Sequence, residues 1–397
     1  MKYWFKYIAA IFLITLVVAC KKPYNPPAIS AAGSYLVVAG IINSGSDSTT
    51  ITLSRTVSLS SKVTTNPVFN AIVAVQSDQN VTYPLTETTN GNYVCAGLNL
   101  NSVNKYRLSI KTNNEQYYSD YVAVLNSPPI DSVYYTTTNS GLNIYSATHD
   151  PTNTVKYYRW DYQETWIIHS YYYSFFKSNG DTVLARDLNN DEIGTCWRSD
   201  TSSTIVLGAT ADLAKDVVSA NPITSIASTS EKITSEYSII VKQYALTGDA
   251  YSFWTNLKKN TEQLGSIFDA EPSQINGNIH SATNAAEPVV GYISCGNTSS
   301  IRIFINNQNL PAWSAQPYYV ACQLDTFLYK YVTPGSKTIV NQVDEFINYD
   351  KGGAINLEIP VDAIGLPGMP PIGYTASSRE CVDCTLRGTN KQPSFWK

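Results

Sequence analysis

The first part of the chain is a series of short apolar runs separated by turn residues. Between residues 35 and 126 turn residues such as Asn, Ser, Gly or Asp separate these runs, and residues 50–54 alternate cleanly between polar and apolar positions. No helical period intervenes between the runs. This pattern predicts short antiparallel strands packed as an immunoglobulin-like β-sandwich. The expected strands span 35–42, 50–54, 71–76, 91–95, 106–111 and 117–124.

A proline-containing linker at 126–129 interrupts this pattern, and residues 130–397 predict a second, larger domain of the β-sandwich type. Its clearest strand is 160–168, which continues the alternation with aromatic side chains on one face. That face should be buried, and it includes Glu164. Residues 171–176 are aromatic on both faces, which predicts a strand covered on each side. One face of the 160–168 strand carries Trp160, Tyr162, Glu164, Trp166 and Ile168.

One segment of the second domain is helical in pattern. Residues 249–264 place apolar side chains at approximately helical spacing, and Thr247 and Asp249 supply the cap and first-turn acid of a helix. Residues 361–374 are rich in Gly and Pro and predict a long ordered loop in a Gly/Pro-rich tail. The predicted fold is therefore mainly β, with one or two short helices.

The N-terminus carries an export signal. Lys2 and Lys6 precede an apolar run at 8–18. This run is too short to span a bilayer, which requires about 20 apolar residues. The run ends in Leu-Val-Val-Ala-Cys, which resembles a bacterial lipobox. Residues 1–19 are thus expected to be a signal peptide, with lipid on Cys20 and an extended, Pro-containing tether over 20–34. An ordinary signal peptide with an unmodified Cys20 is the alternative.

Charge and composition narrow the classes of partner. The chain has 27 basic and 31 acidic residues and no basic block, which argues against nucleic-acid binding. Charged residues make up 15% of the chain, against about 25% in a typical soluble domain. The 29 tyrosines suit the faces of β-sheets, and exposed ones would suit recognition of sugars or peptides.

Glu164 is the main candidate for chemistry. As a general acid it would make the protein a hydrolase acting on the envelope or on glycans, but a glycosidase needs a second carboxylate at a defined separation. A buried carboxylate paired with an arginine is the favoured interpretation, and Arg302 on another strand is the candidate partner.

A weak calcium candidate lies at Asp187, Asn189 and Asp191, where oxygen ligands alternate along the chain. The Gly and Glu that complete such a loop are missing, so a solvated turn is favoured. The three histidines are scattered without metal-ligand spacing, and no motif of a serine hydrolase, zinc protease or P-loop enzyme occurs. We therefore expect no cofactor and favour a non-enzymatic role.

Several short motifs together resemble a known family. Most lie between Trp160 and Tyr292, and the last two close the chain. The combination resembles the Bacteroidota outer-membrane lipoprotein family known as domain of unknown function 4249. The motifs are Tyr-Arg-Trp at 158–160, Glu-Thr-Trp at 164–166, Tyr-Ser-Ile at 237–239, Gln-Tyr at 243–244, Ser-Ile-Phe-Asp at 266–269, Gly-Asn-Ile at 277–279, Glu-Pro-Val at 287–289, Gly-Tyr at 291–292, Cys-Val-Asp-Cys at 381–384 and Phe-Trp at 395–396.

The resemblance implies a lipobox, an immunoglobulin-like N-terminal part and a β-rich C-terminal part, but no catalytic residue. It also implies a TonB-dependent receptor as partner. The expected function is an outer-membrane-anchored accessory or ligand-binding lipoprotein, whose ligand and membrane face stay open. A hydrolase using Glu164 and a structural or adhesion module of the envelope are the alternatives.

The same resemblance, together with the expected export to an oxidising compartment, favours disulfide bonds between cysteines. A tail without strand or helix pattern would fray unless it were tied down. Two disulfides are therefore predicted to join Cys196 and Cys322 to Cys381 and Cys384, in an order left open, with Cys95 and Cys295 free. A direct bridge between Cys381 and Cys384 is the rival.

Overall fold

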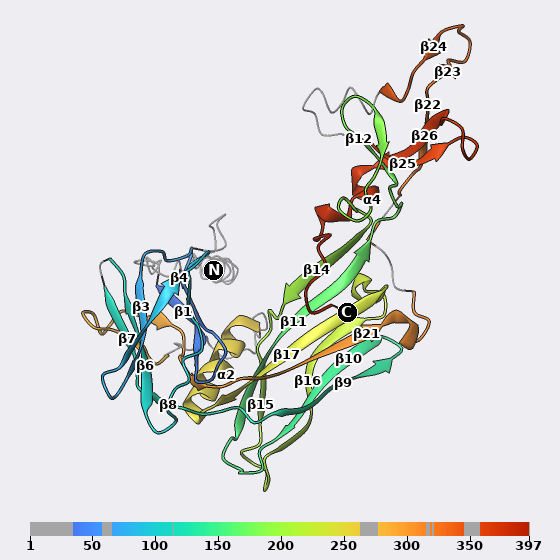
Figure 1. Cartoon of the computed structure of the whole chain (residues 1–397). Helices are drawn as coiled ribbons and strands as arrows, with labels where there is room; N and C mark the ends of the chain where they lie inside the picture. The colour runs from blue at the N-terminus through green and yellow to red at the C-terminus, as the bar shows by residue number, and fades with distance from the viewer. Residues whose placement is uncertain are drawn as a thin grey trace, which may run out of the picture.

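The computed structural model describes residues 35–57, 66–113, 115–262, 277–314, 318–319, 321–344 and 358–396. The predicted signal peptide, Cys20 and the tether lie outside these described residues. The described chain is mainly β, as predicted, and its parts are an N-terminal sandwich, a central pair of sheets and a distal arm (Figure 1).

The N-terminal sandwich follows the predicted strands closely. Alternate side chains such as Val38, Ile51 and Leu108 point into one core, which explains why the alternating runs fold as strands. Only β4 was missed, because Pro84 interrupts its pattern. The strands are β1 (Leu36–Asn43), β2 (Thr49–Arg55), β3 (Ile72–Ser77), β4 (Thr82–Glu87), β5 (Asn92–Cys95), β6 (Lys105–Lys111), β7 (Gln116–Ser119) and β8 (Val122–Ala123).

Three later strands complete this sandwich. β18 (Ile279–Ser281) pairs antiparallel with β7, while β19 (Val289–Val290) and β20 (Cys295–Gly296) pair parallel with β1. The expectation that residues 130–397 form one domain is wrong for this segment. Its apolar side chains, among them Ile279 and Ile293, belong to the N-terminal core, so the chain crosses between the two domains more than once.

The central domain consists of two sheets packed face to face. One has the order β16-β10-β9, and the other has β14-β11-β17-β21 with β15 beside β11. Their shared core contains Trp160, Trp166, Tyr237 and Leu142, so the aromatic face predicted for 160–168 is buried. The strands are β9 (Ile130–Thr138), β10 (Gly141–His149), β11 (Tyr157–His169), β14 (Thr195–Thr201), β15 (Val206–Ala209), β16 (Val217–Ala227), β17 (Glu236–Leu246) and β21 (Ser299–Asn306).

The predicted helix is present as α2 (Gly248–Glu262). Thr247 Oγ1 accepts the Ala250 N–H at 3.2 Å, as a capping residue does, and Ala250 and Phe253 are buried. Two short 3₁₀ turns, η1 (Glu231–Ile233) and η2 (Asn307–Asn309), flank strands of the central sheet. Within the described residues, no helix has the length and apolar character needed to cross a membrane.

The distal arm extends from the end of β11 and β14 (Figure 1). Its largest sheet has the order β22-β26-β25, and the hairpins β12–β13 and β23–β24 lie in the same arm. The arm elements are β12 (Phe176–Ser178), β13 (Val183–Ala185), β22 (Asp325–Leu328), β23 (Tyr331–Val332), β24 (Ile339–Val340), β25 (Glu358–Ile364), β26 (Gly373–Ser378), α4 (Arg379–Val382) and η3 (Cys384–Leu386).

Two expectations about the arm are wrong. Residues 361–374 are not one long loop, because they include most of β25 and the start of β26, and only the stretch between these strands is irregular. Residues 171–176 do not form a strand covered on each side. The N–H groups of Tyr171 and Tyr172 both donate to Cys381 O, which turns the chain and leaves Phe175 exposed.

Candidate functional site

Glu164 is buried and paired, but not with the predicted partner. Its Oε2 lies 2.5 Å from Lys232 Nζ, and its Oε1 accepts the Tyr237 hydroxyl at 2.6 Å. Arg302 instead donates to Ser238 Oγ at 3.1 Å and lies 3.6 Å over the ring of Phe395. Successive side chains of a strand point to opposite faces of the sheet. Glu164 is in register with Ile239 and Ile303, so Arg302, next to Ile303, points to the face opposite Glu164.

The contacts of Glu164 are those of a structural ion pair. Both carboxylate oxygens have donors, and only 5% of the side chain is exposed. Burial and the neighbouring Glu164 raise the pKa of Tyr237, so its hydroxyl stays protonated and donates. A general acid must reach a substrate atom directly or through one water, and this geometry leaves little access.

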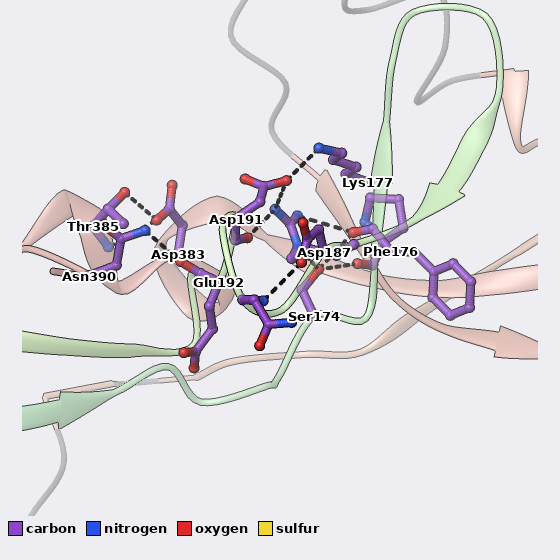
Figure 2. A network of polar contacts seen from close by, with 12 residues as sticks. Ser174, Phe176, Lys177, Asp187, Asp191, Glu192, Asp383, Thr385 and Asn390 are labelled. Atoms are coloured by element: carbon purple, nitrogen blue, oxygen red, sulfur yellow. Dashed lines mark hydrogen bonds and ion pairs between the residues drawn. The ribbon is translucent and has the colours of Figure 1, made fainter. Parts of the chain in front are cut away.

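The weak calcium candidate is occupied by other interactions. Asp187 Oδ1 accepts the Asn189 N–H at 3.0 Å, while Asp191 Oδ2 lies 2.6 Å from Lys177 Nζ and 3.4 Å from Arg186 Nη1 (Figure 2). The loop is therefore a hydrogen-bonded turn with an ion pair. In the part of the chain that the structure describes, no three His, Cys, Asp or Glu side chains gather as metal ligands.

Arg186 organises the base of the arm. Its side chain is 6% exposed, and its guanidinium donates to Ser174 Oγ, Phe176 O and Asp191 O. Burial lowers the pKa of Arg186, but the side chain keeps its charge because the unperturbed value is so high. This buried network fastens the loop after β13 to the first strand of the arm.

Two disulfides fasten the C-terminal tail, and the structure gives the order that the sequence left open. Cys196 pairs with Cys384, and Cys322 pairs with Cys381. The tail also forms a backbone bridge between Trp197 and Thr389. The arm and the tail are thus covalently tied to each other and to β14.

The two remaining cysteines in the described chain are free, as predicted. Cys295 is buried, and burial raises the pKa of its thiol to about 12. Cys95 is only partly buried. The buried Cys295 thiol is therefore protonated at neutral pH and a poor nucleophile.

An apolar groove on the arm is a candidate binding feature. Its volume is about 820 Å³, and its walls include Val183, Leu328, Tyr329, Pro371 and Tyr374. The loop between β25 and β26 supplies one wall. The groove was not predicted from the sequence, although this Gly/Pro-rich loop also holds large apolar side chains. Leu366, Met369 and Ile372 are 69%, 67% and 59% exposed.

This architecture and these contacts define a mainly β protein of several sheets, with two disulfides and an apolar groove on its distal arm. The chain belongs to the family described as Domain of unknown function (DUF4249), whose model matches residues 21–302. The resemblance noted from the sequence is thereby confirmed.

Comparison with curated proteins found no match. Among solved structures, the adhesin InvE of Yersinia pseudotuberculosis is similar at 13% identity and a TM-score of 0.16, over 53% of this chain and 55% of that chain. The chain thus spans about half the length of that adhesin structure. At this TM-score the likeness supports no inference about fold or function.

Proposed function

We propose that the protein is a lipid-anchored accessory module of the outer membrane whose distal arm binds a protein partner. The apolar groove of the arm carries this proposal. Monomeric soluble proteins rarely expose clustered large apolar side chains, and such patches mark interaction sites. Leu366, Met369 and Ile372 lie together on the loop that borders the groove.

The construction of the arm suits this role. The bridge between Cys322 and Cys381 and the buried Arg186 network hold the base of the arm in one arrangement. A surface that is already ordered loses less conformational entropy when it binds. Aromatic and aliphatic walls such as Tyr329 and Leu328 provide the anchoring pocket typical of protein interfaces.

A TonB-dependent receptor is the proposed partner, on the basis of the family resemblance. Among the alternatives, a hydrolase using Glu164 is less well supported because that carboxylate is bound to Lys232 and Tyr237. A structural or adhesion module could use the same groove.

The lipid anchor is tested by Cys20→Ser. The expected result is a precursor that retains the signal peptide and takes up no labelled fatty acid, because the serine hydroxyl cannot form the thioether to diacylglycerol. Electrophoretic mobility and acyl labelling in the native host measure this. Unchanged labelling and mobility in the variant would refute the anchor.

Association is tested by co-purification of the full chain from membranes in mild detergent. A β-barrel receptor should be recovered in stoichiometric amount, and Ile372→Asp should reduce that recovery at least tenfold by placing a charge in the apolar contact. Val103→Asp is the matched control, since Val103 is 85% exposed on the N-terminal sandwich. Product formation from envelope glycans that Glu164→Gln abolishes would favour the hydrolase instead.

A further inference from the structure

A second cavity lies between the N-terminal sandwich and the central sheet. Its volume is about 620 Å³. One wall is formed by β1 and the turn after it, and the other by β11, β17 and α2. This interdomain cleft is polar, unlike the groove on the arm. Ligand sites often occupy such positions between domains, in this range of size.

The walls of the interdomain cleft are held in place by the junction between the domains. Ser44 Oγ donates to Asn126 Oδ1 at 2.9 Å, and Ser127 N–H donates to Asn297 Oδ1 at 2.8 Å. From the central sheet, Gln243 Nε2 donates to Pro128 O at 3.0 Å. The two segments that connect the domains, at 126–128 and at Asn297, are thus hydrogen-bonded to each other, and the first is also bonded to β17. The cleft is therefore formed before any ligand binds.

Arg159 is held in the cleft against two aromatic rings, with 15% of its side chain exposed. Its guanidinium lies 4.5 Å from the ring centre of Tyr244 and 4.1 Å from that of Trp254. Its Nη2 donates to Asp161 at 3.0 Å, while its Nε is buried and has no partner among the described residues. A guanidinium held in this way can receive an anion at little cost in side-chain entropy.

Two further charged side chains line the cleft. Lys242 faces the cleft from β17, and Asp47 lines it from the turn after β1. Among the described residues, neither side chain forms an ion pair or a hydrogen bond. The cleft therefore presents an uncommitted cation on one wall and an uncommitted carboxylate on the other.

We propose that the interdomain cleft binds a short peptide with free ends. Its carboxylate would lie at Arg159 and Lys242, and its ammonium group at Asp47. The charged lining residues Arg159, Lys242, Asp47 and Asp161 sum to zero formal charge, which fits a zwitterion better than an anion. A sugar is disfavoured because the Arg159 guanidinium already covers the rings of Tyr244 and Trp254, on which a sugar would stack.

The cleft continues into a groove that would hold the rest of the peptide. This groove has a volume of about 380 Å³ and shares Asp161, Lys242 and Tyr244 with the cleft. Thr201 and Ser202 add hydroxyl groups along it, which can bond backbone amides. Peptide binding goes beyond the proposed docking of the arm, since the two surfaces belong to different parts of the molecule.

Equilibrium dialysis of the purified full chain against an unblocked tripeptide pool, with mass spectrometry of the retained peptides, tests the proposal. We expect retention of unblocked peptides and at least tenfold weaker retention of the same pool with amidated C-termini or acetylated N-termini. Lys242→Met should weaken binding about tenfold, and Asp47→Asn should do the same. The exposed Lys105→Met and Asp212→Asn are matched controls and should bind normally.

Equal retention of blocked and unblocked pools would overturn the proposal, as would retention of neither pool at millimolar concentration. Preferential retention of a neutral oligosaccharide pool would also overturn it. Thermal unfolding of each variant establishes that it is folded. None of these results depends on a receptor, so failure here is distinguishable from failure of the docking proposal.

Discussion

At the scale of single residues, Glu164 shows how a charge is accommodated in an aromatic core. Its carboxylate is compensated by Lys232 and by the Tyr237 hydroxyl. Lys232 Nζ also lies 5.0 Å from the ring centre of Trp166, while 27% of its side chain remains exposed. The pair therefore orders η1 against the sheet and still lets the lysine reach water.

Replacement of Glu164 by Gln should destabilise the fold. We expect a loss of about 1–3 kcal/mol in the free energy of unfolding, because the amide no longer compensates the charge of Lys232 and gives the Tyr237 hydroxyl a neutral acceptor. Urea denaturation followed by circular dichroism measures this. Glu380→Gln is the control, since Glu380 is exposed and bonded to no other described side chain. Equal stability of both variants would contradict the structural role.

The burial of Glu164 could be predicted from the sequence, but its partner could not. Alternation within one strand is a local property, and it places Glu164 on the aromatic face. The choice between Arg302 and Lys232 depends on how three strands are registered and where η1 folds back. Such tertiary arrangements leave no periodic signal in the chain.

At the scale of elements, long and regular patterns were reliable guides. The alternation of β11 and the capped period of α2 each specify one conformation. The short strands β18 to β20 carry too few residues to show a pattern, and β19 and β20 form parallel pairs that only the folded domain can provide. Their place in the N-terminal sandwich was therefore missed.

The disulfides are expected to stabilise the tail and the arm strongly. They close loops with sequence separations of 188 and 59 residues. On the chain-entropy model such loops contribute about 4–5 kcal/mol each, as an upper value. Replacing Cys196 and Cys384 together by Ala should lower the free energy of unfolding by a large part of this amount in urea denaturation. Cys95→Ala, which breaks no bridge, is the control, and equal stability of the two would contradict the prediction.

At the scale of the whole molecule, the binding surfaces arise from segments that are distant in sequence. The arm groove joins Val183 of β13 to Leu328 of β22 and Tyr374 of β26. The interdomain cleft joins Asp47 to Lys242 and Trp254. The sequence predicted β domains and a C-terminal tail held by disulfides. It could not predict the arm groove or the interdomain cleft, because each forms only when several sheets have packed together.

Site-specific photo-crosslinking in the native host shows directly whether the arm is the docking surface. A photoreactive residue placed at Ile372 or Met369 should crosslink to a β-barrel receptor, identified by mass spectrometry, because both side chains are exposed beside the groove. The same probe at Val103 should give no such product. Crosslinks to the receptor from Val103 but not from the arm, or no protein adduct from either arm position, would contradict the account.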